Sequence, residues 1–288
     1  MLYAANLPNA GASGDPRALA DLAELAEQAG WDAILLEDYI VYNLVEGQLP
    51  TYDPWVALAA MATRTTRLRL GTLVTALPRR RPWKLAREVL TLDHLSGGRV
   101  TLGVGLGDAT IDRSFIKFGE PIDLSTRAEM ADESLEIITG LWTARSFSYR
   151  GKHYQVEELT FLPAPVQQPR IPIWVGGTWP RRGKRAYRRA FAFDGFAGFR
   201  GIPGNADHGP LNAGDVAEIR AAATKEGCAA SFDIVVGGNP RGADLQHERE
   251  VRTECEHAGA TWWQEWVVGG LDQVRATIRS GPIWTMDR

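Results

Sequence analysis

The sequence has little of what would cross-link the chain, anchor it in a membrane or bind nucleic acid. Two cysteines, Cys228 and Cys255, occur in 288 residues, which indicates free thiols in a reducing compartment. No apolar run reaches the roughly 18 residues of a membrane helix, and the N-terminus lacks the basic stretch of a secretory signal. The formal net charge of −3 argues against a general nucleic-acid binder. We therefore expect a cytoplasmic protein that acts on neither membranes nor nucleic acids.

Several motifs of metal binding and catalysis are also missing. The five histidines show neither the His-x₃-His nor the His-Glu-x-x-His spacing of zinc sites, and the two cysteines are not paired for a metal. Neither a Gly-x-Ser-x-Gly nucleophile elbow nor a Gly-x₄-Gly-Lys-Ser/Thr phosphate loop occurs. The sequence therefore predicts no metal site, no serine hydrolase triad and no P-loop.

The chain does contain a regular alternation of two periodicities. Short apolar or β-branched runs precede amphipathic stretches of about a dozen residues, which is typical of βα units in a parallel sheet. Eight such units favour a closed (β/α)₈ TIM barrel over an open sheet, with residues 1–288 as one domain. The expected strands are Leu2–Leu7, Ala33–Leu36, Leu68–Val74, Val100–Val104, Ile171–Val175, Asp194–Gly198, Ser231–Val236 and Thr261–Glu265. The expected helices are Pro16–Ala29, Asp53–Thr63, Trp83–Leu95, Thr126–Trp142, Pro180–Ala192, Ala213–Glu226, Gly242–Ala258 and Leu271–Ser280.

One segment departs from this alternation before the fifth expected strand. The runs Phe147–Tyr149 and Tyr154–Val156 flank a short polar turn, which predicts a small hairpin. Four prolines then fall within residues 161–172 and predict a stiff, extended excursion over the surface.

Polar residues follow the second and third expected strands, where a barrel carries its reacting groups. Successive side chains of a strand point to opposite sides, so only one carboxylate of Glu37 and Asp38 faces the barrel axis. Asp38 and Tyr39 are candidates for ligand contact, with structural capping as the alternative. Arg79–Arg81 either hold an anionic tail or form a solvated loop.

Two glycine-rich segments end the fourth and fifth expected strands. The run 103–108, Gly-Val-Gly-Leu-Gly-Asp, leaves one backbone face without side chains, which a flat ring or a phosphate could approach. Its spacing does not match a dinucleotide-binding fingerprint, and tight barrel packing would equally account for the glycines. Gly176, Gly177 and Thr178 precede an expected helix that carries Arg181, which makes them a candidate anion site. The later arginines of that helix are expected to form a solvated basic face.

Three parts of the sequence resemble the bacterial luciferase-like monooxygenases, a superfamily of flavin- and deazaflavin-dependent oxidoreductases. They are Leu68–Thr75 with Arg81-Pro82, Leu85–Arg99 with Leu102–Gly107, and Phe161–Gly177 with Gly259–Trp263. The resemblance covers roughly residues 1 to 280. It implies a luciferase-like TIM barrel with a flavin ring in the mouth of the barrel. It also implies a non-prolyl cis peptide near Leu73-Val74 that backs the ring.

The resemblance implies roles for individual residues as well. Gly105 and Gly107 would run beside the cofactor, and the segment 176–178 would hold its phosphate. Asp108 aligns with an acidic catalytic residue of some deazaflavin-dependent members. The expected catalytic residues are Asp108, Asp38 and Tyr39, with Asn6 as a lesser candidate. The expected cofactor-binding residues are Thr72, Leu73, Val74, Gly105, Gly107, Gly176, Gly177, Thr178 and Arg181.

The main interpretation is a two-component monooxygenase that uses reduced FMN and O₂ on a small organic substrate. A separate flavin reductase would supply the reduced FMN, and a homodimer is expected by analogy with the family. Hydride transfer with the deazaflavin coenzyme F-420 is an alternative, although Asp38-Tyr39 replaces the Asp-His pair of many deazaflavin-dependent members. A non-catalytic flavin-binding protein is a second alternative, and an unrelated barrel enzyme is a third. Tryptophans near the strand ends, Trp262, Trp263 and Trp266 among them, either line an apolar substrate pocket or belong to the core.

Overall fold

The computed structural model describes residues 1–42, 49–109, 112–179, 185–201 and 208–285. Within these residues, eight parallel strands close into a barrel, because the last strand pairs with the first. Their order around the barrel is β1 (Leu2–Leu7), β2 (Ala33–Leu36), β3 (Arg69–Ala76), β4 (Val100–Gly105), β7 (Ile173–Trp179), β8 (Gly195–Gly201), β10 (Asp233–Gly237) and β11 (Trp262–Trp266). The expected closed (β/α)₈ barrel is confirmed.

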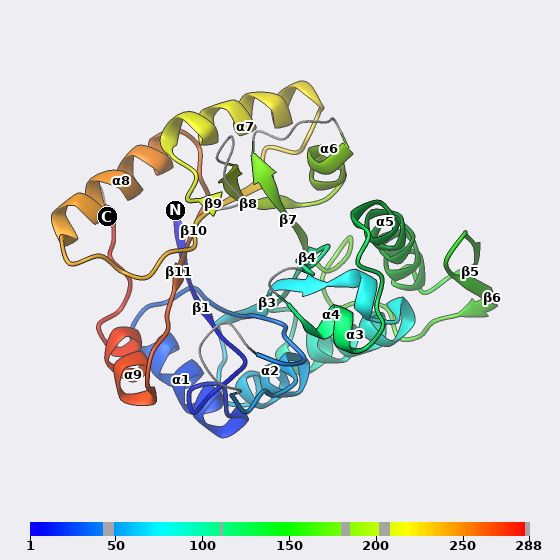
Figure 1. The fold of residues 1–288 in the computed structure, drawn as a ribbon, viewed down its shortest axis with the longest axis horizontal. Helices are drawn as coiled ribbons and strands as arrows, with labels where there is room; N and C mark the ends of the chain where they lie inside the picture. The colour runs from blue at the N-terminus through cyan, green and yellow to red at the C-terminus, as the bar shows by residue number, and fades with distance from the viewer. Residues whose placement is uncertain (43–48, 110–111, 180–184, 202–207, 286–288) are drawn as a thin grey trace.

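Helices cover the outside of the barrel, and Figure 1 shows them around the strands. They are α1 (Pro16–Gln28), α2 (Pro54–Ala62), α3 (Pro82–Ser96), α5 (Leu124–Leu141), α6 (Arg185–Phe191), α7 (Ala213–Lys225), α8 (Leu245–His257) and α9 (Leu271–Arg279). No helix within the described ranges is long and apolar enough to cross a membrane.

Local sequence explains where several helices begin and end. The side chain of Asp15 accepts hydrogen bonds from the backbone of Arg17 and Ala18, and Asp53 caps α2 in the same way. A proline follows each of these aspartates at the first helical position, where its missing N–H costs nothing. Gly97 ends α3 with a φ of 68°, a left-handed conformation that glycine adopts without strain.

The expected hairpin is present as β5 (Ser146–Arg150) paired antiparallel with β6 (Gln155–Thr160), beside α5 in Figure 1. The proline-rich segment that follows lies along α3. Asp93 of α3 accepts hydrogen bonds from the backbone of Val166 and Gln167, and the guanidinium of Arg87 stacks on the ring of Phe161 at 3.7 Å. This excursion is therefore fixed to the barrel wall by side chains of one helix.

Two expectations about local structure need correction. A short helix, α4 (Ser114–Lys117), forms in a segment with no clear helical periodicity, and a single helical turn (η1, Leu77–Arg79) follows β3. The helix expected at Pro180–Ala192 is present as Arg185–Phe191, and its expected first turn lies outside the described residues. The helix expected from Gly242 begins at Leu245, because Asp244 supplies its N-terminal cap.

The barrel interior is a small apolar core separate from the core under the helices. Ala4, Leu35, Trp174 and Trp262 belong to this interior cluster, and the two indoles meet edge to face with centroids 5.2 Å apart. Chain neighbours of these residues, such as Tyr3 and Leu36, belong to the larger cluster between strands and helices. The alternation of a β-strand therefore assigns every second residue to the barrel interior.

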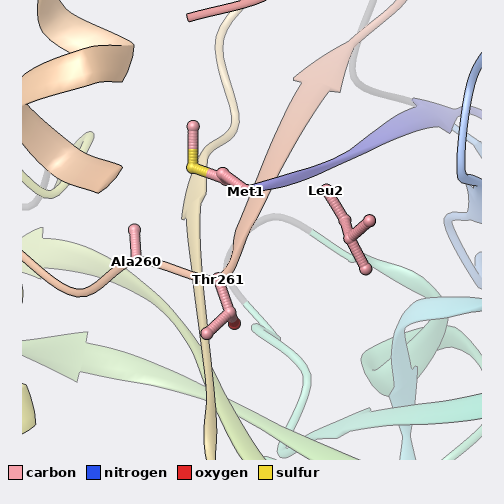
Figure 2. Close-up of a pocket in the computed structure, with 4 residues that line it drawn as sticks. All are labelled: Met1, Leu2, Ala260 and Thr261. Atoms are coloured by element: carbon pink, nitrogen blue, oxygen red, sulfur yellow. The ribbon is translucent and has the colours of Figure 1, made fainter. Parts of the chain in front are cut away.

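Below this core, at the N-terminal ends of the strands, lies a layer of paired polar groups. Asp233 accepts hydrogen bonds from the indole of Trp174 at 2.9 Å and from the hydroxyl of Thr261 at 2.8 Å. Arg69 donates to the hydroxyl of Thr101 at 3.1 Å. An open hollow of about 440 Å³ lies at the same end, lined by Met1, Leu2, Ala260 and Thr261 (Figure 2).

Candidate active site at the barrel mouth

The barrel mouth is the set of residues at the C-terminal ends of the eight barrel strands. Ala4, Leu35, Trp174 and Trp262 mark the interior face of four strands. Two residues further along each strand, the same alternation turns Asn6, Glu37, Gly176 and Gln264 toward the axis of the mouth. The mouth therefore has a polar side on β11, β1 and β2 and a glycine side on β3, β4 and β7.

The glycine side is built around an irregular end of β3. The register between β3 and β4 shifts between Thr72 and Thr75, and the peptide bond Leu73-Val74 is cis. The non-prolyl cis peptide implied by the family resemblance is confirmed. Leu73 and Val74 are partly exposed, whereas Thr72 is fully buried.

Two glycines make room for the side chain of Val74. A Cβ atom at Gly105 would lie 2.7 Å from Cγ2 of Val74, and one at Gly176 would lie 3.0 Å from Cγ1. Any larger residue at these places on β4 or β7 would push Val74 out of its position. Glycine is therefore explained here by the shape of the β3 end, and it leaves an apolar, side-chain-poor surface at the mouth.

The buried Thr72 serves the strand rather than the mouth. Its hydroxyl donates to the carbonyl of Gly103 at 3.0 Å and accepts from the hydroxyl of Thr75 at 3.0 Å. Thr72 thus holds the irregular end of β3 against β4.

The polar side carries four buried atoms that make no hydrogen bond of ordinary length and angle in the part of the chain that the structure describes. They are Oδ1 of Asn6, Oε2 of Glu37, Oε1 of Gln264 and Nε1 of Trp266. Asn6 and Gln264 are only 6% and 5% exposed. Buried polar groups in folded proteins nearly always make hydrogen bonds. Several that do not, at the end where TIM barrels bind their ligands, indicate a binding site. This gathering is the clearest sign of a binding site at the mouth.

Glu37 is the ionisable member of the polar side. Burial raises the pKa of its carboxyl to about 7, while hydrogen-bonding contact with the Trp266 indole and the Tyr42 hydroxyl lowers it by a smaller amount. Burial also raises the pKa of Tyr42, and so does the neighbouring charge of Glu37. The carboxyl of Glu37 can therefore change its protonation state near neutral pH, as a group that exchanges protons must.

Asp38 points to the other side of β2 and is fully engaged there. Arg80 donates to it through Nε at 2.8 Å and through Nη2 at 2.7 Å, and Arg79 approaches it at 3.4 Å. Arg79 also pairs with Asp112 in the connection after β4. Asp38 therefore ties the β2, β3 and β4 connections together. Because both arginines are paired with acids of the chain, Arg79 and Arg80 neither hold an anionic tail nor form a solvated loop.

Tyr39 is held near the mouth by its backbone. Asn9 accepts a hydrogen bond from the Tyr39 N–H at 3.2 Å and donates one to its carbonyl at 2.8 Å. The Tyr39 ring packs edge to face on Tyr42, with centroids 5.2 Å apart. Burial and the charge of Glu37 raise the pKa of Tyr39, so its hydroxyl stays protonated at neutral pH. A hollow of about 420 Å³ lies beside this segment, lined by Ile40, Val41, Leu49, Pro50 and Thr51.

Asp108 lies exposed on the connection after β4. The backbone of this connection is fixed on both sides of it. Arg127 donates to the carbonyl of Gly107 at 2.6 Å, and the N–H of Asp112 donates to the carbonyl of Asp108 at 2.7 Å. Gly107 has a φ of 70°, and the ring of Phe115 occupies the space of a Cβ atom there. Asp108 is thus presented at the rim of the mouth, outside the buried polar side.

The candidate anion site at the end of β7 is only partly described. Gly176, Gly177 and Thr178 are partly exposed and lie at the C-terminal end of that strand. Arg181 lies outside the described residues, so its relation to them is open. Within the described residues, no three metal-ligating side chains gather in one place.

The sequence analysis considered Glu37 but selected Asp38 as the candidate for ligand contact, and it did not identify Gln264. Gln264 lies two positions after the inward Trp262 on β11, and only the pairing of β11 with β1 reveals that direction. Trp266 was noted only as an aromatic residue, whereas its buried, unpaired N–H is the property that matters at the mouth.

Comparison with known proteins agrees with this geometry. The model of the luciferase-like monooxygenase family matches residues 1–239. The chain is 33% identical over 178 residues to a protein of Microbacterium testaceum named F420-dependent glucose-6-phosphate dehydrogenase, covering 61% of this chain and 51% of that protein. It is also 33% identical over 201 residues to an uncharacterized protein of Mycobacterium tuberculosis, covering 65% and 66%. The chain thus spans between about half and just under two thirds of these relatives' own lengths.

Solved structures share the same fold at low sequence identity. The coenzyme F420 dependent tetrahydromethanopterin reductase of Methanopyrus kandleri superposes with a TM-score of 0.70 at 17% identity, covering 97% of this chain and 98% of that one. The monooxygenase RslO1 of Streptomyces bottropensis superposes with a TM-score of 0.72 at 21% identity, covering 97% of both. Because the family model matches most of this chain, the chain belongs to the luciferase-like monooxygenase family.

Proposed function

We propose that this protein is a flavin-dependent oxidoreductase, a monooxygenase that uses reduced FMN and O₂ on a small organic substrate. The observation that carries the proposal is the glycine side of the mouth. Val74 sits against Gly105 and Gly176 at the irregular end of β3, which leaves a smooth apolar surface for one face of a flat ring. Membership of the luciferase-like monooxygenase family supports the same chemistry.

The residues present suit a flavin. Leu73 and Val74 would lie against the ring, and Gly105 and Gly107 would allow the backbone of β4 to approach it. The polar edge of the ring would find hydrogen-bond partners in the amide oxygens of Asn6 and Gln264 and in the indole N–H of Trp266. The phosphate would be bound by Gly176, Gly177 and Thr178, with Arg181. When bound, the reduced flavin supplies the electrons that activate O₂.

The chain's own contribution is to position the ligand and to exclude water. The polar side would replace water as the hydrogen-bond partner of the bound ligand. Because these side chains are buried, each such hydrogen bond would be stronger than one made in water. Tyr39 and Tyr42 place two aromatic rings next to the hollow lined by Ile40 and Val41. That hollow is where we place entry of the organic substrate. A separate flavin reductase would deliver the reduced cofactor, and Asp108 would act at the rim.

A second candidate function keeps the fold and changes the cofactor. The relative of Microbacterium testaceum is named for use of F420, which favours hydride transfer with this deazaflavin. The anionic tail of F420 needs cationic partners, yet Arg79 and Arg80 are already paired with Asp112 and Asp38. Arg81, which is exposed, would take that role.

A binding titration distinguishes the candidates. The purified protein is titrated with oxidised FMN, reduced FMN under anaerobic conditions, and oxidised F420, with binding followed by fluorescence and calorimetry. Preferential binding of reduced FMN supports the monooxygenase, and O₂ uptake with candidate substrates then follows. Preferential binding of F420 that weakens with added salt supports hydride transfer, since salt screens contacts to a charged tail. Binding of neither cofactor in the micromolar range overturns both.

A further inference from the structure

Glu37 stands apart from the residues that the family resemblance singled out. Its Oε2 is buried without a hydrogen bond of ordinary geometry, on the same side of the mouth as three other such atoms. Asp38 next to it is paired with Arg80, whereas the carboxyl of Glu37 meets Tyr42 and Trp266 and has no cation against it among the described residues. We propose that Glu37 is a catalytic residue of this site, which contacts the bound ligand through Oε2 and exchanges a proton with one of its oxygen or nitrogen atoms. This inference rests on the proposed function.

The position of Glu37 supports direct contact with a ligand. Glu37 follows Leu35 on the inward face of β2, and Leu35 belongs to the barrel interior. Asn6 on the neighbouring strand β1 faces the same space, because it pairs across the sheet with Leu35 and alternates with the inward Ala4. Glu37 and Asn6 are therefore neighbours on the inner surface of the mouth, where a ligand on the axis can reach both.

The electrostatic surroundings suit proton exchange. Tyr42, Tyr39 and Trp266 face the carboxyl, and none of them carries a charge at neutral pH. The charged groups of the neighbouring connections are paired among themselves: Asp38 with Arg79 and Arg80, Asp112 with Arg79, and Glu265 behind β11 with Arg241 and Arg252. Glu37 thus has no counter-ion of its own among the described residues, and burial holds its pKa at about 7.

The step itself is a simple transfer that balances. The protonated carboxyl gives its proton to a lone pair of the ligand oxygen or nitrogen, which forms the new O–H or N–H bond, while the electron pair of the broken O–H bond stays on Oε2 and leaves Glu37 as a carboxylate. The reverse transfer restores the acid. Tyr42 and Trp266, which favour the charged form, stabilise the carboxylate while it exists.

The matched pair of variants is Glu37→Gln and Glu88→Gln. Glutamine keeps the shape of glutamate and removes the exchangeable proton. Glu88 on α3 is paired with cations instead, since its Oε1 accepts from Lys84 at 2.6 Å and its Oε2 lies 3.9 Å from Arg80 on the outside of the barrel. It therefore controls for the loss of a buried carboxyl away from the mouth.

The readout is the number of protons exchanged on FMN binding, measured by calorimetry in two buffers that differ in ionisation enthalpy, between pH 6 and 8. The phosphate of FMN titrates in this range equally in all variants, so the difference between proteins isolates Glu37. We expect Glu37→Gln to differ from the wild type by about 0.3 proton or more per FMN near pH 7. Glu88→Gln should match the wild type.

Other outcomes separate this inference from the proposed function. If FMN binds and Glu37→Gln exchanges as many protons as the wild type, the inference fails and the proposed function stands. If the wild type binds neither FMN nor F420, the proposed function fails and the inference fails with it. Should Glu37→Gln not fold, carbon-13 spectra of glutamate-labelled wild type decide. A carboxyl that titrates near pH 7 and shifts when FMN is added supports the inference, and its absence overturns it.

Discussion

The two ends of the barrel interior treat buried polar groups in opposite ways. At the N-terminal end, Asp233 is bonded to both Trp174 and Thr261, and Arg69 is bonded to Thr101. At the C-terminal end, the polar side of the mouth leaves atoms of Asn6, Glu37, Gln264 and Trp266 without hydrogen bonds of ordinary geometry among the described residues. The same eight strands supply both ends.

This difference between the two ends indicates that one end of the barrel interior contributes to stability and the other to ligand binding. Paired polar groups at the N-terminal end add to stability and fix the packing of the indoles above them. Unpaired groups at the mouth cost stability, and such a cost persists where binding requires it. Substitutions at the two ends should therefore differ in size and even in sign.

The largest effect is expected for Asp233→Ala at the N-terminal end. The change removes the acceptor of two hydrogen bonds and leaves the Trp174 N–H buried without a partner. We expect a loss of about 3 kcal/mol in the free energy of unfolding, measured by urea denaturation at pH 7. FMN binding of the folded fraction should stay the same.

Gln264→Ala at the mouth is the matched variant. Its Oε1 has no partner to lose, so we expect a cost of about 1 kcal/mol from lost packing alone. Equal losses for Asp233→Ala and Gln264→Ala would erase the contrast between the two ends.

The next effect has the opposite sign and depends on pH. The pKa of Glu37 rises from 4.5 in the unfolded chain to about 7 in the folded protein, so the folded state holds the extra proton between these values. Stability from this group is present below pH 4.5 and is lost as the pH rises through 7. Because the glutamine of Glu37→Gln carries no ionisable proton, we expect this variant to exceed the wild type by at most about 3 kcal/mol at pH 9 and by less than about 1 kcal/mol near pH 5.

Asp38→Asn tests whether the carboxyl next to Glu37 contributes to stability through its contacts with Arg79 and Arg80. It gives up charge-assisted hydrogen bonds to Arg80, so it should be less stable than the wild type at both pH values. Urea denaturation at pH 5 and 9 measures both variants. A stabilised Asp38→Asn, or a Glu37→Gln without pH dependence, would contradict the assignment of the two side chains.

A smaller effect is expected on the glycine side of the mouth. In Gly105→Ala the new Cβ would lie 2.7 Å from Cγ2 of Val74. Displacing Val74 should cost about 2 kcal/mol by overpacking, and it should weaken FMN binding by about tenfold because the surface under the ring changes. Fluorescence titration measures the affinity. Gly270→Ala, where a Cβ meets nothing within 4 Å, should leave the affinity unchanged.

The sequence alone was sufficient to predict the barrel, because the periodicities of strands and helices are local features of the sequence. β1 and β2 begin and end where the apolar runs do, and the proline after Asp53 marks the start of α2. The resemblance to the family was sufficient for the cis peptide at Leu73-Val74. Short α4 was not predictable from periodicity, since four residues form only one turn.

The candidate site was harder to predict because it depends on which way side chains point. Alternation shows that Glu37 and Asp38 face opposite sides, yet it does not show which one faces inward. That requires the register of β2 against β1 and the positions of Arg79 and Arg80, which come from other parts of the chain. Gln264 reaches the mouth only because β11 pairs with β1 and closes the barrel.

The smallest effect is expected in the hollow at the N-terminal end, which Figure 2 shows between Met1, Leu2, Ala260 and Thr261. Leu2 is 39% exposed there, so Leu2→Ala removes little buried surface and should cost less than about 1 kcal/mol. FMN affinity should be the same as in the wild type, since the ligand site lies at the other end of the strands. A tenfold weaker FMN affinity in Leu2→Ala, with the fold intact, would place a ligand at the wrong end. The contrast drawn from the paired and unpaired polar groups would then be lost.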